Sequence, residues 1–276
     1  MATMLFPTPD LPARFAQELG TALVGRTLEY HQQVGSTNDL VRTQAAAGAP
    51  EGLVILAEEQ VAGRGRQGRG WSAPPGSSLL LSLLLRPVWL APEAGFALTM
   101  LAGVALCEAV EQVALPLQAA LKWPNDLMLP GPDGTLRKSA GVLSEVCIEQ
   151  ERITWVAVGM GVNVAWSPAG VVDGRDLALS ATSIDAASGH PTDRLALLRA
   201  LLQRFDTRYQ ALRQGRREEL FDAWRARLAT IGQMVQIRLP QGMLAGHAEG
   251  VDLAGALLVR DAAGLLHSVT AGDVEA

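Results

Sequence analysis

The pattern of apolar segments changes near Ile231, and this change divides the chain into two parts. Before that residue, apolar segments of strand length alternate with longer segments of helical length. After it, only short strand-like segments remain, separated by turns that contain glycine. A chain of 276 residues is long enough to bury a sizeable core beside a smaller one. The sequence therefore predicts an α/β domain over residues 1–230 and a small β-barrel over residues 231–276.

The positions of the individual elements follow from apolar spacing and turn residues. In the larger part we expect strands at 27–34, 53–58, 77–86, 117–123, 127–129, 138–149 and 152–164. We expect helices at 11–24, 37–47, 92–114, 191–213 and 216–228, and barrel strands at 235–239, 245–251, 257–260 and 265–269.

Composition and charge narrow the class of protein. The formal net charge of −5 and the pI of about 5.4 argue against nucleic acid as the main partner, because phosphate binding usually needs a basic surface. Cys107 and Cys147 form no CxxC or Cys/His cluster, so neither a zinc site nor a disulfide framework is supported. The apolar runs at 79–85 and 96–107 are shorter than the roughly 20 residues of a membrane span, and residues 1–12 do not resemble a signal peptide. We therefore expect a cytoplasmic protein with no nucleic-acid or membrane partner.

A glycine- and arginine-rich stretch at residues 63–70 matches G-x-G-x-x-G, but its context contradicts a dinucleotide site. That fingerprint needs a helix to begin at the last glycine, and here Trp71 opens a stretch with two prolines. The remaining feature is three arginines, Arg64, Arg66 and Arg69, spaced among glycines that allow close approach of a ligand. Guanidinium groups bind phosphate and carboxylate, so we interpret the stretch as an anion-binding loop; the alternative is a solvated basic loop.

At this point the chain resembles the biotin–protein ligase family, because several of its motifs fall in the family's order over residues 35–275. The glycine–arginine loop together with the Lys-Trp-Pro-Asn-Asp motif is the most specific part. The stretch from Gly250 to Val274 looks like the family's SH3-like domain. The other motifs are Ser36-Thr37-Asn38, Glu59-Gln60-Val61-Ala62 leading into Gly63–Trp71, Lys122-Trp123-Pro124-Asn125-Asp126, Lys138-Ser139-Ala140-Gly141-Val142-Leu143 and Gly159-Met160-Gly161-Val162-Asn163.

The resemblance implies an ATP-dependent biotin–[acetyl-CoA-carboxylase] ligase. Its substrates would be ATP and biotin, used with Mg²⁺, and its fold an α/β (α+β) type with a mixed, largely antiparallel sheet flanked by helices, as in class II aminoacyl-tRNA synthetases. The first step would form biotinyl-5'-AMP, and the second would transfer biotin to a lysine of the biotin carboxyl carrier protein of acetyl-CoA carboxylase. A homodimer through the same sheet edge that binds the carrier is compatible with the family. Only 35 residues precede Ser36, too few for the DNA-binding domain that some members carry, so we expect the monofunctional type.

The resemblance also implies roles for individual residues. Catalysis would rest on Lys138, Arg66 and Asp126. The metal ligands stay undetermined, with Asp126 a candidate for Mg²⁺. Biotin would contact Ser36, Thr37, Asn38, Gln60, Arg64, Gly65, Arg66, Lys138 and Gly141. The adenylate would contact Arg64, Arg66, Trp71, Asn125, Asp126, Lys138 and Asn163.

Each of these residues also has a simpler structural interpretation. Ser36 and Thr37 suit the N-cap of a helix, and Pro, Asn and Asp all favour turns. Lys138 fits a surface lysine at the end of a strand, and Trp71 fits a packed core aromatic. Asp126 is compatible with two chemical roles, as a ligand of Mg²⁺ or as the base for the incoming lysine amine. Because biotinyl-adenylate reacts with water, we expect the loop at 63–71 to be mobile when empty and to close over the ligand.

Three other functions remain alternatives. An octanoyl or lipoyl ligase shares the fold and the acyl-transfer chemistry. A DNA-binding regulator is disfavoured by the acidic balance and the short N-terminus. A pure interaction module would not need a large α/β domain before the barrel.

Overall fold

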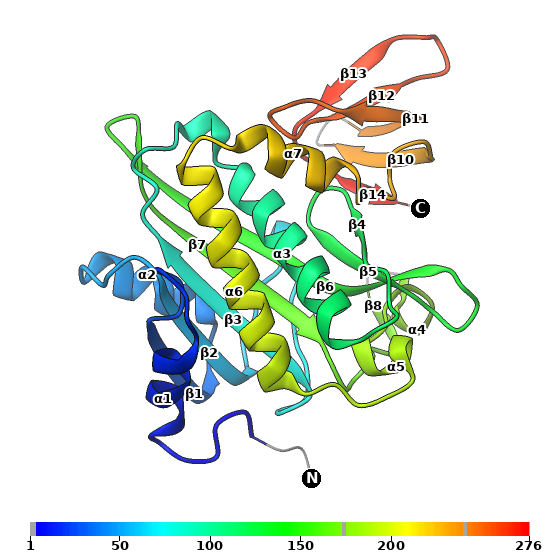
Figure 1. Cartoon of the computed structure of the whole chain (residues 1–276). Coiled ribbons are helices and arrows are strands. Elements are labelled where there is room, and N and C mark those ends of the chain that lie inside the picture. Colours follow the sequence, from blue (N-terminus) through cyan, green and yellow to red (C-terminus); the bar gives the residue numbers. More distant parts are fainter. Residues whose placement is uncertain (1–3, 173–174, 240–241, 276) are drawn as a thin grey trace.

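A seven-stranded sheet forms the centre of the larger part of the protein (Figure 1). The computed structural model describes residues 4–172, 175–239 and 242–275. The strand order is β1-β2-β3-β7-β6-β5-β4, in which β1 and β2 are parallel and all other pairs are antiparallel. The predicted mixed, largely antiparallel sheet is confirmed. The strands are β1 (Thr27–Val34), β2 (Leu53–Gln60), β3 (Ser78–Leu85), β4 (Ala120–Lys122), β5 (Asp126–Pro130), β6 (Leu136–Glu149) and β7 (Arg152–Asn163).

Helices cover both faces of this sheet. The helix α2 (Thr37–Ala46) contacts β2, β3 and β7, and its Val41 and Ala45 pack against Leu53, Ile55 and Leu84. Side chains alternate along a strand, so the neighbouring residues, such as Val54 and Leu56, point to the other face of the sheet. The helices α3 (Ala97–Val113) and α6 (Arg194–Arg213) lie on that face. The remaining helices are α1 (Leu11–Glu18), α4 (Leu177–Ser180), α5 (Ile184–Ser188) and α7 (Arg217–Arg225).

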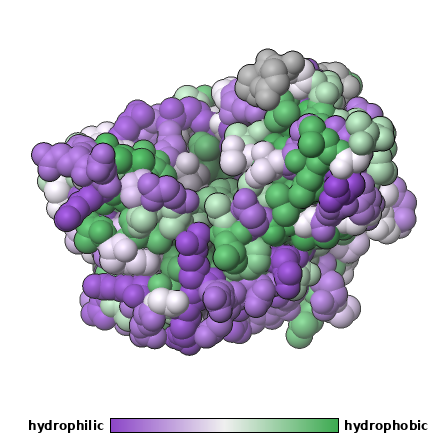
Figure 2. Space-filling model, turned by 90° about the horizontal axis from the view of Figure 1, so that it is seen from above, coloured by the Kyte–Doolittle hydropathy of each residue, from purple (hydrophilic) through white to green (hydrophobic). Residues whose placement is uncertain are grey.

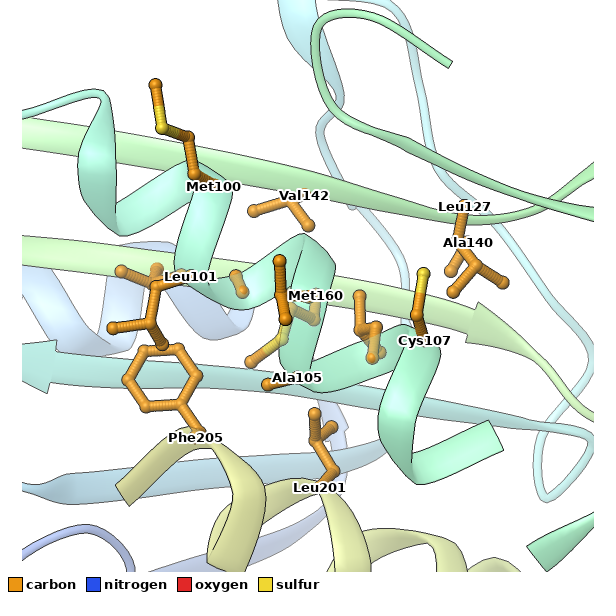
Figure 3. Close-up of a cluster of buried hydrophobic side chains, with 14 of the residues drawn as sticks. Met100, Leu101, Ala105, Cys107, Leu127, Ala140, Val142, Met160, Leu201 and Phe205 are labelled. Atoms are coloured by element: carbon orange, nitrogen blue, oxygen red, sulfur yellow. The ribbon is translucent and has the colours of Figure 1, made fainter. Parts of the chain in front are cut away.

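The helix α3 is the centre of the hydrophobic core. Figure 3 shows its side chains between the strands that carry Val142 and Met160 and the helix α6, which contributes Leu201 and Phe205. By length and composition the segment Pro92–Val113 could cross a membrane, but 83% of that window is buried inside the protein. The predicted assignment of this segment to the core is therefore confirmed.

A second sheet, with the strand order β13-β12-β11-β10-β14, contains the end of the chain. All of its strand pairs are antiparallel, as expected for a small barrel-like domain. The last strand was not predicted from the sequence, and it pairs with β10. Figure 2 shows the whole protein from above the view of Figure 1, and this face carries hydrophobic patches separated by hydrophilic side chains. The strands are β10 (Met234–Leu239), β11 (Gly242–Val251), β12 (Leu257–Arg260), β13 (Leu266–Val269) and β14 (Asp273–Glu275).

The two sheets are joined around Trp123, which is buried between them. Its indole Nε1 donates to the carbonyl of Gly255 at 2.9 Å, and its backbone N–H donates to Thr230 Oγ1 at 2.9 Å. Gly255 has a φ of +91°, and a Cβ there would overlap the ring of Phe96. The second sheet is therefore packed tightly against the segment that leads into β5.

Several elements differ from the sequence prediction. The first helix ends at Glu18 rather than near residue 24, because the backbone N–H groups of Ala22, Leu23 and Val24 donate to the buried carboxylate of Asp206. The long helix α6 begins at Arg194, where the side chain of Asp193 caps it, rather than at residue 191. The short elements α4, α5, β8 (Val171–Val172) and β9 (Arg175–Asp176) were not predicted.

Candidate active site

The beginning of α2 lies beside the end of β2, and Thr37 and Gln60 connect them. The backbone N–H and the hydroxyl of Thr37 both donate to Gln60 Oε1, at 2.8 and 3.1 Å. Ser36 is the N-cap residue and is buried, but its side chain makes no capping hydrogen bond. Plain helix capping therefore does not account for the Ser36 hydroxyl, and a ligand remains a candidate partner for it.

Thr37 and Asn38 continue into a buried polar network on the sheet. Thr37 Oγ1 lies 2.7 Å from Ser82 Oγ, which donates to Asn38 Oδ1 at 2.6 Å. The amide of Asn38 donates to Glu145 Oε2 at 2.7 Å. A Cβ on Gly159 would collide with this amide, so the glycine is needed for the close approach. The sequence did not single out Ser82 or Glu145, because neither belongs to a motif.

The arginine loop is folded in this structure, and each of its arginines binds a different part of the protein. Arg64 Nη2 lies 2.6 Å from Asp39 Oδ1 and 3.2 Å from Glu145 Oε1. Arg66 Nη1 donates to Asn125 Oδ1 at 3.1 Å, and Arg69 Nη2 lies 2.8 Å from Asp273 Oδ1. Backbone bonds close the loop, from Gly65 N–H to Arg69 O at 2.6 Å and from Trp71 N–H to Gly63 O at 2.9 Å. These contacts argue against the alternative of a purely solvated loop.

Burial and nearby charges act on the pKa of Arg66 in opposite directions. The Arg66 guanidinium is largely desolvated, and this burial lowers its pKa. Asp273 and Asp126 act in the opposite direction, because their negative charges favour the charged form of the arginine. Arg66 remains a cation at neutral pH, and its charge is held in a weakly solvated place where it acts strongly on a nearby anion.

Trp71 lies flat on the sheet, above two glycines. A Cβ added to Gly161 would stand 2.6 Å from the indole Nε1 and closer still to Cε2, whereas one on Gly141 would stand 3.4 Å from Cζ3. The Nζ of Lys138 lies 5.6 Å from the ring centroid, within the range of a cation–π contact. Trp71 is only partly buried, so it forms a platform over the strands rather than a core aromatic.

Lys138 and Asp126 are brought together by the pairing of β5 with β6. Lys138 Nζ lies 2.7 Å from Asp126 Oδ1. The backbone of Lys138 pairs with Met128 on one side, and its carbonyl accepts a hydrogen bond from Thr182 at 2.9 Å on the other. Lys138 is the third residue of β6 and its side chain is 33% exposed, so its position agrees with a lysine near a strand end, but its ammonium is engaged by Asp126.

Asn125 and Asn163 complete the set of predicted residues. The Asn125 amide donates to the carbonyl of Val142 at 2.7 Å while its oxygen accepts from Arg66, so both ends of the amide are in use. The Asn163 amide donates to the carbonyl of Thr182 at 3.1 Å, but its oxygen is buried without a partner.

Three buried polar atoms at this place have no hydrogen-bond partner among the described residues: Trp71 Nε1, Asp126 Oδ1 and Asn163 Oδ1. Asp126 Oδ1 is close to the Lys138 ammonium, but not in a hydrogen-bonding direction. Buried polar groups in folded proteins are almost always paired. Within the part of the chain that the structure describes, Trp71 Nε1 and Asn163 Oδ1 have neither a hydrogen-bond partner nor an ionic partner, and they support a polar ligand at this site.

The described ranges 4–172, 175–239 and 242–275 contain no group of three His, Cys, Asp or Glu residues arranged for a metal ion. Asp126 is the one carboxylate among the predicted site residues, and Lys138 neutralises it. Mg²⁺ commonly binds through one or two carboxylates together with substrate phosphates and water. The residues of the site therefore fit a Mg²⁺ ion that is bound mainly by the phosphates of the nucleotide, with Asp126 as the one carboxylate that the predicted site residues supply.

Two surface hollows lie away from these residues. One of about 300 Å³ lies between the end of α3 and the beginning of α6, and one of about 620 Å³ lies beside the β6–β7 turn. Neither is lined by a predicted site residue. These two hollows therefore do not mark the candidate site, where Arg64 and Arg66 contact Asp39, Glu145 and Asn125.

Comparison with known proteins gives consistent matches over most of the chain. Residues 30–163 match the biotin/lipoate A/B protein ligase family, and residues 230–275 match the biotin protein ligase C-terminal domain. The biotin–[acetyl-CoA-carboxylase] ligase of Mycobacterium tuberculosis is 34% identical over 94% of this chain and 92% of its own length. The bifunctional ligase/repressor BirA of Bacillus subtilis is 32% identical over 93% of this chain and 76% of its own length.

Solved structures show the same fold. The biotin protein ligase of Aquifex aeolicus in complex with biotin and ATP has a TM-score of 0.73, at 24% identity over 91% of this chain and 98% of that one. The biotin protein ligase of Leishmania major in complex with biotinyl-5-AMP has a TM-score of 0.60, at 25% identity over 89% of this chain and 99% of that one.

Proposed function

Since this chain belongs to the biotin protein ligase family and is an ATP-dependent ligase, we propose that it activates biotin as biotinyl-5'-AMP and transfers it to one lysine of a biotin carboxyl carrier protein. The observation that carries this proposal is the meeting of three cations, Arg64, Arg66 and Lys138, with the unpartnered atoms of Trp71 and Asn163. This arrangement fits a ligand that has an anionic centre and a polar aromatic end.

In the first step, a carboxylate oxygen of biotin attacks the α-phosphorus of ATP, the bond to the β-phosphate oxygen breaks, and pyrophosphate leaves. The step brings two anions together, so positive charge has to offset their repulsion. Lys138 takes the bridging position between the carboxylate and the α-phosphate, and Arg66 and Arg64 stabilise the phosphate oxygens. Their present partners are the carboxylates of Asp39, Glu145 and Asp126 and the amide of Asn125, which the phosphates and the carboxylate of the ligands replace.

The biotin end of the ligand is assigned to the beginning of α2. Biotin has a polar ureido group, and a buried ureido group needs fixed donors and acceptors. Ser36, Thr37, Asn38 and Gln60 supply hydroxyl, amide and backbone groups there. Gly65 and Gly141 allow the chain to approach the ligand closely.

The nucleotide end is assigned to Trp71, Asn125 and Asn163. The ring of Trp71 offers a flat surface for the adenine, and the free Asn163 Oδ1 can accept from an amino group. When Mg²⁺ is bound, it screens the phosphate charges. Asp126 is the carboxylate available to contact that ion once Lys138 turns towards the ligand.

In the second step, the neutral amine of the carrier lysine attacks the acyl carbon, and AMP leaves. The amine has to lose a proton, and Asp126 can accept it. The variant Asp126→Asn separates the two roles. A base for the amine is needed for transfer only, whereas a metal ligand is needed for adenylate formation as well.

The substrate assignment is tested by pyrophosphate release with ATP and Mg²⁺ in the presence of biotin, octanoate or lipoate. Release with biotin alone is expected. Release with octanoate or lipoate instead would assign the protein to the lipoate branch of the family, and the absence of release with all three would refute the proposal.

The remaining assignments concern domains, partners and location. We assign residues 1–230 to catalysis and residues 231–276 to the C-terminal domain, and we place the reaction in the cytoplasm, where ATP is available. The carrier docks along an edge of the seven-stranded sheet, and the same edge serves for homodimer formation. Biotin labelling of a carrier domain, abolished when its target lysine is replaced with arginine, tests the partner; sedimentation tests the dimer.

A further inference from the structure

Among the three loop arginines, Arg69 binds the C-terminal sheet. Its Nη2 lies 2.8 Å from Asp273 Oδ1, although the two residues are 204 positions apart in the sequence. The Asp273 side chain is only 15% exposed, whereas that of Arg69 is 41% exposed. The Nε of Arg69 also donates to the carbonyl of Arg66 at 3.3 Å. One guanidinium therefore connects the turn of the loop to the C-terminal sheet.

Asp273 is held firmly because it lies on β14. This strand pairs with β10, in which Asp273 stands opposite Arg238, and the next residue, Val274, is buried. The preceding residue, Gly272, lies so close to β10 that a Cβ would be 2.6 Å from Ile237. The carboxylate therefore offers a fixed anchor rather than a mobile surface charge.

The same small sheet supports the opposite side of the candidate site. The carbonyl of Gly255 accepts the hydrogen bond from Trp123. Two residues after Trp123 lies Asn125, which binds Arg66, and the next residue is Asp126, which pairs with Lys138. Burial lowers the pKa of Arg66, and among the charges that raise this pKa Asp273 has the largest effect. The C-terminal domain thus contacts both the arginine loop and the turn between β4 and β5, whose Asn125 binds Arg66.

We propose that Asp273 is a positioning residue for the arginine loop. By binding Arg69, it fixes the end of the loop, while Arg64 and Arg66 remain able to exchange their protein partners for a ligand. Arg69 is then an anchor rather than a phosphate ligand. The proposal explains why one of the three arginines pairs with the C-terminal sheet, whereas the other two pair with residues 1–230.

The first test needs no ligand. Limited trypsin digestion is followed by mass spectrometry of cleavage after Arg64 and Arg66, whose rate reports how often the loop opens. Asp273→Asn is expected to raise that rate about two- to fivefold, which corresponds to roughly 0.5–1 kcal/mol for a partly exposed ion pair. The charge reversal Arg69→Glu with Asp273→Arg is expected to restore most of the wild-type rate.

The matched control is Glu249→Gln, which breaks the ion pair with Arg260 in the same sheet but away from the loop. It is expected to leave cleavage after Arg64 and Arg66 unchanged. An unchanged rate in Asp273→Asn overturns the proposal. An equal rise in Glu249→Gln also overturns it, because the effect would then be a general loosening of the sheet.

A second readout rests on the proposed function. With biotin and ATP, the Asp273→Asn enzyme is expected to lose its bound adenylate two- to fivefold faster than the wild type, because the loop that retains it opens more often. Equal loss from both enzymes overturns the proposal. If the wild type formed no adenylate, the proposed function would fail, whereas the cleavage test would still decide the role of Asp273.

Discussion

The contact between Trp71 and Gly161 allows a sharp test of the site. In the variant Gly161→Ala, the new methyl group would stand 2.6 Å from the indole Nε1, whereas ordinary contacts lie between 3.4 and 4 Å. The ring must therefore move away from the sheet by roughly 1 Å. The backbone of Gly161 is that of an ordinary paired strand residue, so alanine brings no backbone strain.

The cost of this substitution is expected in ligand binding rather than in folding. An extra methyl in a well-packed place costs about 1–3 kcal/mol when the neighbours cannot move. Without ligand, the partly buried ring can lift towards solvent, so the free energy of unfolding should fall by less than about 0.5 kcal/mol. With the adenylate bound, the ring has to stay in place, and the affinity for ATP in the presence of biotin should fall roughly 10- to 100-fold.

The matched control is Gly141→Ala on the neighbouring strand. Its methyl group would stand 3.4 Å from Trp71 and 3.3 Å from Lys138 Nζ, which the neighbours can absorb by shifts of a few tenths of an ångström. Because Gly141 is itself assigned to the biotin side of the site, this variant should weaken the binding of biotin, whereas at saturating biotin its loss of affinity for ATP should stay below roughly threefold. Calorimetric titration measures the binding, and urea unfolding measures the stability. Equal affinities of Gly161→Ala and the wild type would refute the assignment of Trp71 to the ligand.

Three further outcomes are expected. Lys138→Gln should slow adenylate formation at least roughly 100-fold, because a cation close to the α-phosphate is lost, while Lys138→Arg should retain part of the rate in the same pyrophosphate assay. Arg66→Gly should release the adenylate and biotinylate an added bystander protein several-fold faster on a streptavidin blot; the chain itself holds only two lysines, Lys122 and Lys138, so little of the label should fall on it. Both tyrosines should resist deprotonation, because burial followed by hydrogen bonding to a glutamate raises the pKa of Tyr30 to about 12 and also raises the pKa of Tyr209. The folded state then keeps protons that the unfolded state loses near pH 10, so stability should decline as the pH rises from 10 towards 12; tyrosinate absorbance appearing at pH 10 in the folded protein would contradict this.

Much of the fold could be predicted where the sequence carries its own local signal. The apolar run of β3 is buried along its whole length, and the predominantly apolar α3 lies in the core as expected. The end of α1 could not be predicted, because it is set by Asp206, a residue far away in the sequence. The short helices α4 and α5 span only four and five residues, too few for a periodic pattern.

The motif residues of the candidate site do come together in the structure, but their partners carried no sequence signal. Glu145 lies in the middle of a long strand, and Ser82 interrupts an apolar run by one residue. Asp273 is 204 positions from the arginine that it binds. Contacts of this kind depend on strand register and on the packing of the second sheet, neither of which follows from local spacing.

The central claim is that these residues form one site that makes and retains biotinyl-5'-AMP. It is tested most directly by mixing the protein with biotin, ATP and Mg²⁺, removing free ligands rapidly, and quantifying biotinyl-5'-AMP in the denatured protein by mass spectrometry. We expect close to one adenylate per wild-type chain and very little in Lys138→Gln. A folded wild-type protein that retains no adenylate, or a Lys138→Gln variant that retains as much as the wild type, would contradict the account.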